Sequence, residues 1–378
     1  MKIAILTYPI HSNFGFLMQA YALQTYLKKL GHEPFTFYIT QSEKSCVNKL
    51  KQTIKDIVYT VKGIEGYRCF RYWPTKEQQE YMDKKTWNFV NNNIQLTAPI
   101  KKLSDLYSFD VNDYDAYIVG SDQVWRYAYI DKITNFFFDF LPDEKPRMSY
   151  AASFGIGILD YNVKDKEECK HLLKKFDVVT VREYDGVNIC KKEFGVDAIK
   201  VLDPVFLLDK KYYSELSALS EEIYKEKYLF TYILDPNTEK QTFVNKVASE
   251  KNLKVVNLLP EKFFLKGPTE IDKMIYPSVY EILKAFNDSE YVITDSFHGT
   301  AFSILLNKQF TIFSNKLRGN SRLSSILKTF GLEDRILSEN HNYEELIDFD
   351  NVNRIISEQR AFSYNILEKF LCGIECGS

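Results

Sequence analysis

Short apolar runs alternate with amphipathic segments along most of the chain, which is the pattern of an α/β protein. Apolar runs predict strands at 2–7, 34–39, 116–120, 148–152, 177–181, 199–202, 228–233, 253–258, 291–294 and 310–313. Helical spacing of apolar residues predicts helices between them, for example one that ends near Leu30 and others at 238–250 and 279–286. Because strands that alternate with helices form parallel sheets, we expect two Rossmann-like domains that face each other across a cleft.

Changes in this pattern indicate where the domains end. The segment around 214–227 is charged, and the strand–helix alternation restarts after it. We therefore expect an N-terminal domain over 1–219, a C-terminal domain over 220–340, and a helical tail over 341–378 that packs back on the N-terminal domain. Residues 41–110 have no strong period, with helices expected at 49–61 and 76–91. The length of 378 residues agrees with two domains.

One predicted strand ends in a segment with the chemistry of an anion site, Thr294-Asp-Ser-Phe-His-Gly-Thr300. His298 lies in the turn, and the pair Gly299-Thr300 is expected to open a helix. The start of a helix offers free backbone N–H groups and the positive end of its dipole. Histidine changes charge most easily near neutral pH. We interpret the segment as an anion site beside a proton donor, and the alternative is a histidine that only caps the turn.

Other predicted strands end in residues that could complete such a site. Arg182 follows one strand directly, and Ser121 and Asp122 follow another. Arginine pairs with carboxylate or phosphate through two parallel hydrogen bonds. The carboxyl ends of parallel strands meet at one edge of a sheet, so these groups are expected to converge. The structural alternatives are that Arg182 pairs with Glu183, with Asp185 or with a helix carboxylate across the cleft, and that Asp122 caps the next turn.

Two further groups stand at predicted loop positions. Arg318 and Arg322 follow the last strand and could add positive charge, or they could be ordinary solvated surface residues. Asn13 and Gly15 follow the first strand, in a loop that has one glycine and therefore lacks a dinucleotide-binding fingerprint. All these residues together suit an anionic substrate with an acid and a base nearby.

Composition narrows the classes of function. The net charge is −2, which gives no electrostatic footprint for nucleic acid. The 6 cysteines show no paired metal-ligand spacing, so we expect free thiols, including Cys372 and Cys376, and no metal. The N-terminus reads as a strand rather than a leader, and no apolar run approaches the roughly 20 residues of a membrane span. We expect a cytoplasmic protein.

Short blocks spread over most of the chain occur in the order typical of a known family. They are Asn13-Phe-Gly15 with Leu17-Met-Gln-Ala-Tyr-Ala-Leu-Gln24, Gly120-Ser-Asp-Gln-Val-Trp125, Ser149-Tyr-Ala-Ala-Ser153, Val181-Arg-Glu183, Leu202-Asp-Pro204 and Thr294-Asp-Ser-Phe-His-Gly-Thr300. On these blocks the chain resembles the polysaccharide pyruvyl transferase family. The resemblance covers most of the length and implies a two-Rossmann fold of the glycosyltransferase-B type. It implies phosphoenolpyruvate as donor, a sugar as acceptor, a pyruvate ketal and free phosphate as products, and neither a cofactor nor an essential metal.

The resemblance also implies roles for individual residues. The family's essential histidine corresponds to His298 and its donor-binding arginine to Arg182. From the chemistry of ketal formation we expect His298 to act as general acid or to stabilise the leaving phosphate, and Asp122 to be the candidate base. Many members read Arg-Leu-His-Gly where this chain reads Ser-Phe-His-Gly, so Ser296 replaces an arginine. Arg318 or Arg322 is expected to compensate. The expected donor-binding set is Ser296, Gly299, Thr300, Arg318, Arg322, Ser121 and Ser153.

The acceptor is expected to be a hexose of a cell-surface polysaccharide or of its lipid-linked precursor. In the second case the protein would work as a peripheral protein at the inner face of the membrane. We expect acceptor contacts from Asn13 and Gly15 and from the aromatic residues Tyr72 and Trp73. Two alternatives are a nucleotide-sugar-dependent glycosyltransferase and a non-catalytic carbohydrate-binding protein of the same fold, since fold alone does not set function. Donor binding and phosphate release would separate the three.

Overall fold

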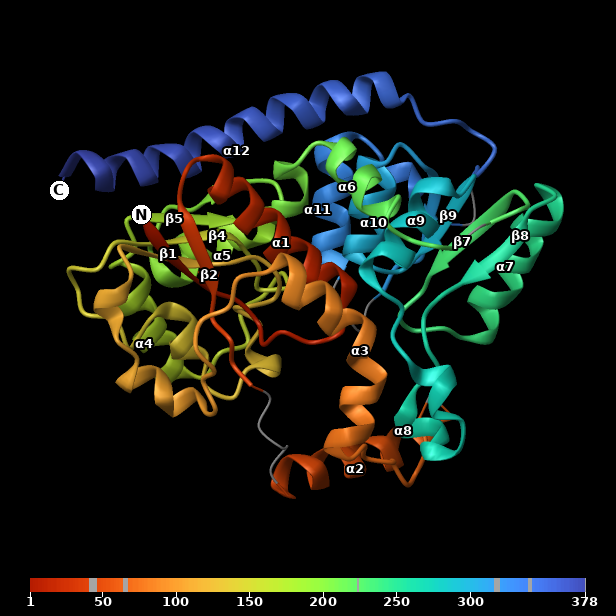
Figure 1. Cartoon of the computed structure of the whole chain (residues 1–378), viewed down its shortest axis with the longest axis horizontal. Helices are drawn as coiled ribbons and strands as arrows, with labels where there is room; N and C mark the ends of the chain where they lie inside the picture. The colour runs from red at the N-terminus through yellow and green to blue at the C-terminus, as the bar shows by residue number, and fades with distance from the viewer. Residues whose placement is uncertain (41–45, 64–66, 223, 316–319, 339–341, 378) are drawn as a thin grey trace.

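Two parallel sheets, one in each half of the chain, form the framework of the molecule (Figure 1). The computed structural model describes residues 1–40, 46–63, 67–222, 224–315, 320–338 and 342–377. The first sheet has six strands in the order β2-β1-β3-β4-β5-β6, and the second has four in the order β10-β9-β7-β8. Every pairing between these strands is parallel. The predicted fold class, α/β with two Rossmann-like halves, is confirmed.

The strands and helices fall close to their predicted positions. The strands of the first sheet are β1 (Lys2–Leu6), β2 (Glu33–Thr36), β3 (Ala116–Val119), β4 (Arg147–Ala152), β5 (Val178–Val181) and β6 (Ile199–Lys200), and those of the second are β7 (Tyr228–Tyr232), β8 (Lys254–Asn257), β9 (Tyr291–Thr294) and β10 (Gln309–Ile312). The helices are α1 (Phe14–Lys29), α2 (Cys46–Val61), α3 (Lys76–Asn93), α4 (Val163–Leu173), α5 (Tyr184–Ile189), α6 (Lys210–Ser217), α7 (Thr238–Glu250), α8 (Phe263–Lys266), α9 (Val279–Asp288), α10 (Phe297–Leu305), α11 (Asn320–Phe330) and α12 (Phe349–Gly377).

Helix α10 begins earlier than the sequence predicts. The expected start was the pair Gly299-Thr300, but the helix begins at Phe297. Ser296 has an extended backbone, and its hydroxyl accepts a hydrogen bond from the Gly299 N–H at 3.4 Å, so Ser296 is the N-cap. His298 therefore lies in the first helical turn rather than in the loop before it.

The two halves share one apolar core, which runs from the first sheet through α1 to α9 and α10. Helix α1 is buried over most of its surface because it lies between the halves. The ring of Phe14, at its start, packs against Tyr232, Phe286 and Phe302 of the second half, with ring centroids 5.0 to 6.0 Å apart. Side-chain packing therefore joins the halves in addition to the chain connection.

The C-terminal helix α12 runs along both halves and ends beside the first (Figure 1). The Tyr364 hydroxyl donates to the Leu207 carbonyl at 2.5 Å, and the rings of Tyr26 and Tyr364 stack with centroids 4.3 Å apart. On the opposite side of the molecule, α2, the start of α3 and α8 form a protrusion away from the two sheets (Figure 1).

Candidate functional site

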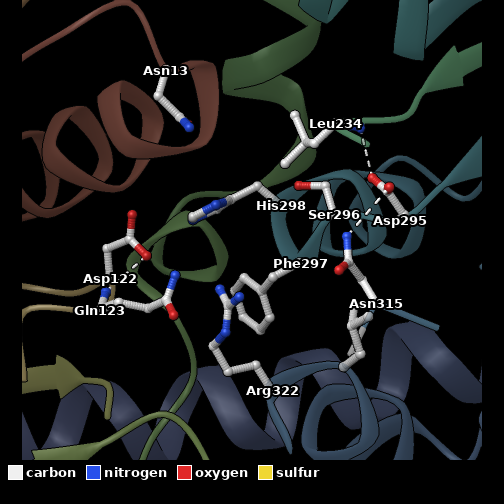
Figure 2. Close-up of a pocket in the computed structure, with 11 residues that line it drawn as sticks. Asn13, Asp122, Gln123, Leu234, Asp295, Ser296, Phe297, His298, Asn315 and Arg322 are labelled. Carbon is white, nitrogen blue, oxygen red and sulfur yellow. Dashed lines mark hydrogen bonds between the residues drawn. The ribbon is translucent and has the colours of Figure 1, made fainter. Parts of the chain in front are cut away.

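A small cavity of about 50 Å³ lies between the carboxyl ends of the two sheets (Figure 2). In the first sheet, β1 has β2 on one side and β3 on the other, so the chain leaves these strands in opposite directions and opens a crevice between their loops. In the second sheet, β7 lies between β8 and β9, so the chain also leaves these strands in opposite directions and opens a second crevice. The loops at both crevices contribute to the wall of the cavity. The wall is formed by Asn13, Asp122, Gln123, Leu234, Asp295, Ser296, Phe297, His298, Asn315, Arg322 and Leu323.

Three of the described helices begin at this cavity. Asn13 caps α1 by accepting from the Phe16 N–H at 3.2 Å, Ser296 caps α10, and α11 brings Arg322 to the wall from its first turn. The start of a helix carries a partial positive charge and N–H groups without helical partners. The cavity is therefore suited to an anion.

His298 is buried, with its ring against the first turn of α1. A Cβ atom on Gly15 would lie 2.1 Å from the His298 Nδ1 atom, so only glycine leaves room for the ring. The other ring nitrogen, Nε2, is 3.8 Å from Asp203 Oδ2 and has no hydrogen-bond partner among the described residues. Burial lowers the pKa of His298, although the carboxylates of Asp203 and Asp122 oppose this shift. The imidazole is neutral at neutral pH when the cavity is empty.

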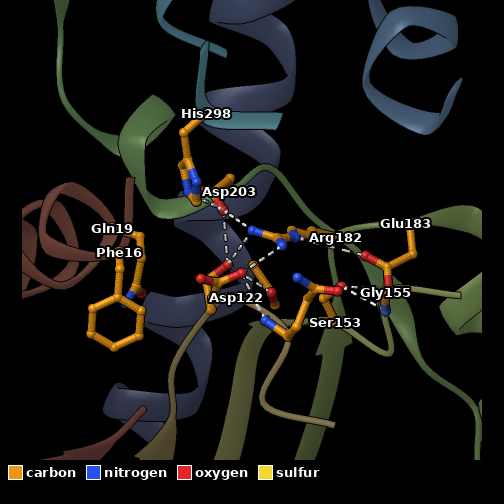
Figure 3. A network of polar contacts seen from close by, with 12 residues as sticks. Phe16, Gln19, Asp122, Ser153, Gly155, Arg182, Glu183, Asp203 and His298 are labelled. Atoms are coloured by element: carbon orange, nitrogen blue, oxygen red, sulfur yellow. Dashed lines mark hydrogen bonds and ion pairs between the residues drawn. The ribbon is translucent and has the colours of Figure 1, made fainter. Parts of the chain in front are cut away.

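Arg182 joins a carboxylate of the cavity wall, Asp122, to one behind it, Asp203 (Figure 3). Its Nη1 donates to Asp203 Oδ2 at 2.8 Å and its Nη2 donates to Asp122 Oδ1 at 3.1 Å. The guanidinium also lies 4.2 Å from the centre of the Phe297 ring. The side chain is only 1% exposed. Arg182 Nε also lies 3.8 Å from Glu183 Oε2, so the alternative of a pair with Glu183 is partly correct, while the closer partners are Asp122 and Asp203.

Ser121 and Ser153 hold carboxylates in place. The Ser121 hydroxyl contacts Asp203 Oδ2 at 2.8 Å and the Ala151 carbonyl at 2.9 Å. The Ser153 hydroxyl donates to Glu183 Oε1 at 2.8 Å. Burial raises the pKa of Glu183 against the opposing effect of Arg182. Neither serine belongs to the cavity wall, so both stand one layer behind it.

Asp122 adopts a backbone conformation that is uncommon for a residue other than glycine, with a φ angle of 78°. The conformation directs its carboxylate toward Arg182, and Oδ1 also accepts from the Gln123 N–H at 2.8 Å. Burial by itself would raise the pKa of Asp122, but Arg182, His298 and Arg322 outweigh it and lower the pKa to about 2. Asp122 is thus a permanent carboxylate and a weak proton acceptor.

Among the described residues, Arg322 is the arginine of the cavity wall, and its side chain points toward the space shared with Asp122 and His298 (Figure 2). Burial and the charge of Arg182 lower the pKa of Arg322 to about 10. The guanidinium therefore stays charged at neutral pH. It places a positive charge in the wall that Ser296 also lines.

The structure brings most of the predicted residues together. Asn13, Asp122, Ser296, His298 and Arg322 form the wall, and Gly15 contacts His298. Gly299 and Thr300 are buried in the first turns of α10, while Tyr72 and Trp73 belong to the protrusion and do not line the cavity. Arg318 lies outside the described residues.

Sequence reasoning missed Asp203 as a site residue. Its signal was present, because Leu202-Asp-Pro204 follows a predicted strand and belongs to the blocks of the resemblance. Gln123 and Asn315 of the wall were also missed. Asp295 has a mainly structural part: its Oδ1 accepts from the Leu234 N–H and its Oδ2 from Lys240 Nζ, both at 2.7 Å, which ties the loop after β9 to the loop after β7.

Comparisons with known proteins identify a family and a set of distant structural neighbours. The family model described as polysaccharide pyruvyl transferase matches residues 13–316. A search of curated protein sequences finds no significant match. Among solved structures, a UDP-GlcNAc 2-epimerase from Neisseria meningitidis bound to UDP-GlcNAc is 12% identical, with a TM-score of 0.47 and coverage of 98% of this chain and 93% of that one. MurG from Acinetobacter baumannii is 7% identical, with a TM-score of 0.44 and coverage of 98% and 99%.

Proposed function

This chain belongs to the polysaccharide pyruvyl transferase family, and we propose that it transfers the pyruvyl group of phosphoenolpyruvate to a hexose of a polysaccharide or of its lipid-linked precursor. The product is a pyruvate ketal on two sugar hydroxyls, and phosphate is released. The observation that carries the proposal is the buried His298, whose Nε2 has no hydrogen-bond partner within the described part of the chain, beside a cavity walled by Arg322 and three helix starts. A small, highly anionic donor suits these surroundings.

We assign proton transfer to His298. A bound donor anion favours the imidazolium form, because an opposite charge nearby raises the pKa of a histidine. The imidazolium donates its proton to the methylene carbon of phosphoenolpyruvate while the first sugar hydroxyl attacks the adjacent carbon. Neutral His298 then accepts the proton of that hydroxyl.

In the second half of the reaction, His298 donates this proton to the leaving phosphate, and the second sugar hydroxyl takes the place of phosphate. The proton of the second hydroxyl returns His298 to the imidazolium form. Of the two hydroxyl protons, one ends on the new methyl group and one on phosphate, so the steps balance. Such acid–base help contributes roughly 10²–10⁴-fold to the rate.

We assign different parts to the two arginines. The resemblance gives donor binding to Arg182, but both of its Nη atoms donate to carboxylates and its side chain is outside the cavity wall. We therefore propose that Arg322 contacts the donor's carboxylate or phosphate. Arg182 positions Asp122 and Asp203, and these carboxylates stabilise the positive charge on His298 and on the reacting carbon. Because the pKa of Asp122 is about 2, we do not assign it as the base.

The test is phosphate release from phosphoenolpyruvate with a panel of hexose-containing acceptors, with the product identified by its mass. We expect His298→Gln to lower kcat by roughly 10²–10⁴-fold, the range of lost acid–base help. We expect Arg322→Gln to raise the KM for phosphoenolpyruvate by about tenfold or more, since a hydrogen bond to a charged group contributes about 1.5–3 kcal/mol.

The control variant is Arg354→Gln, which removes an exposed arginine on α12 that pairs only with nearby residues of its own helix. It should retain normal kinetics. Turnover close to that of the unmodified protein in both site variants would refute the assignment. Transfer from a uridine diphosphate sugar without phosphate release from phosphoenolpyruvate would favour the glycosyltransferase alternative, and binding of sugar without any turnover would favour the carbohydrate-binding alternative.

A further inference from the structure

The apolar face of helix α2 is exposed and its polar face is covered, which is the reverse of an ordinary surface helix in a globular protein. Five apolar residues recur three or four positions apart and are exposed, from Ile57 at 39% to Val61 at 79%; the set is Leu50, Ile54, Ile57, Val58 and Val61. The covered face carries Asp56, whose carboxylate is fully buried and accepts from Arg71 Nε at 2.5 Å. The polar face thus packs on the protein, and the apolar stripe faces outward.

The charge around this helix differs from that of the whole chain. Residues 46–73 contain four lysines and two arginines against one aspartate and one glutamate, in a chain with a net charge of −2. Lys55 and Lys62 are exposed beside the apolar stripe. Lysine can place its aliphatic stem along an apolar surface and its ammonium group in water. The face is therefore apolar in the middle and basic at its margin.

The segment tied to α2 by Arg71 adds exposed aromatic surface. Phe70 is 78% exposed, and Tyr72 is 41% exposed with the Arg68 guanidinium 4.4 Å from its ring centre. Aromatic rings and basic groups together are typical of the boundary between lipid headgroups and acyl chains. Helix α2 lies in the protrusion, away from both sheets (Figure 1). An extended surface such as a membrane can therefore contact α2 without contacting the cavity.

We propose that α2 lies in the surface of an anionic phospholipid membrane, with its apolar stripe among the acyl chains and Lys55 and Lys62 at the headgroups. An amphipathic helix of this type is buried to a depth of about 5–10 Å. No helix of the described residues has the length and apolarity that crossing a bilayer requires. The interaction is thus peripheral. It rests on the exposed face of α2 alone and does not depend on the proposed donor or acceptor.

Anionic lipid fits this face better than a second copy of the chain or an apolar protein segment does. A self-complementary contact would bring the basic margins of two α2 helices together, and like charges repel. Negative headgroups instead attract each lysine near the surface by about 1 kcal/mol. We therefore expect both the apolar stripe and the lysines to contribute, and the contribution of the lysines to fall with salt.

The test is flotation of the full-length protein with vesicles of phosphatidylcholine and phosphatidylglycerol in equal parts, compared with vesicles of phosphatidylcholine alone. We expect binding to the anionic vesicles that weakens at high salt. The double variant Ile54→Glu with Val61→Glu should reduce binding by roughly tenfold or more, because charge is placed in the apolar stripe. The double variant Lys55→Glu with Lys62→Glu should reduce it and remove most of the salt dependence.

A matched control places the same charges on exposed apolar residues elsewhere, Ile158→Glu with Leu346→Glu, at positions 83% and 76% exposed. It should bind like the unmodified protein. No binding by the unmodified protein, equal binding by the stripe variant, or a dimer in solution that only the stripe variant loses would each overturn the proposal. Phosphate release with a soluble acceptor, measured without vesicles, should be unchanged in the stripe variant. Absence of that activity in the unmodified protein would contradict the proposed function and leave the vesicle result standing.

Discussion

The imidazole of His298 is positioned by a residue that has no side chain. Gly15 lies in the first turn of α1, and a Cβ atom there would be 2.1 Å from Nδ1 and 2.2 Å from Cγ of the histidine. Real side chains do not approach so closely, so the ring would have to move. The position of the His298 ring, to which we assign proton transfer, therefore depends on a glycine in the other half of the molecule.

We expect Gly15→Ala to lower kcat for phosphate release by about 10²-fold, because a misplacement of roughly 1 Å at a reacting group can cost that much. Overpacking should also lower the free energy of unfolding by about 1–3 kcal/mol. Steady-state kinetics and urea unfolding measure the two effects.

Gly373→Ala is the matched control, since a Cβ atom at this α12 position meets nothing within 4 Å. It should leave kcat unchanged and stabilise the helix slightly, as alanine favours a helix over glycine. Full activity of Gly15→Ala would mean that the ring is not held by this contact.

At the scale of elements, α12 completes the support of Asp203. The short turn Pro204–Leu207 follows this aspartate, and side chains from other elements donate to its carbonyls, as the Tyr213 hydroxyl does to the Val205 carbonyl at 2.7 Å. Arg360 on α12 donates to the Phe206 carbonyl at 2.6 Å and to the Leu208 carbonyl at 3.0 Å. Buried carbonyls without partners are costly. Helix α12 thus holds in place the turn that directly follows Asp203.

We expect Arg360→Met to lower the free energy of unfolding by about 1–3 kcal/mol, because the buried carbonyls lose their donors. A smaller loss of kcat should accompany it through the displacement of Asp203. Urea unfolding and phosphate release are the measurements. Arg354→Met, on the exposed face of the same helix, should change neither, and equal unfolding free energies for both variants would contradict the role of Arg360.

The strands and much of the site could be predicted at this scale. His298, Asp122 and Arg182 each follow an apolar run, and in a parallel sheet such positions meet at one edge. The partners of Arg182 could not be predicted, because Asp203 follows β6, a strand of two residues, and comes near only through the strand order β4-β5-β6. The exposed stripe of α2 was also beyond prediction, since helical spacing does not tell which face the protein covers.

At the scale of the whole molecule, the empty cavity holds balanced charges. The guanidinium of Arg182 is shared between Asp122 and Asp203, and Arg322 adds one positive charge in the wall. Burial keeps His298 neutral at neutral pH. A donor with several negative charges disturbs this balance, and the group that can respond by taking a proton is the imidazole.

We therefore expect phosphoenolpyruvate to bind with uptake of a proton by His298. Without a donor, the pKa of His298 lies below its usual 6.5, and the bound anion raises it. The affinity for phosphoenolpyruvate should therefore fall as the pH rises from the lower of these two pKa values to the higher. The slope is at most about tenfold per pH unit for one proton. Calorimetry in buffers of different ionisation enthalpy measures the uptake.

The variant His298→Gln should bind phosphoenolpyruvate without this proton uptake. Only the change in protonation of the donor itself should remain in the calorimetric signal. The same proton uptake in the unmodified protein and in His298→Gln would show that another group responds to the donor.

The contacts of α12 also set the order in which the protein can fold during synthesis. Tyr26 donates to Glu368 at 2.5 Å, and the Leu202 N–H donates to the Ser363 hydroxyl at 3.1 Å, so residues near both ends of the chain complete the first half. Domains generally fold as units, from the N-terminus onward, as the chain leaves the ribosome. The contacts of α12 with the first half can form only after the second half has been translated, because α12 follows the second half in the chain. Until α12 has been made, the surface of the first half that α12 covers stays exposed. A stop codon before α12 would leave this surface exposed in the finished protein.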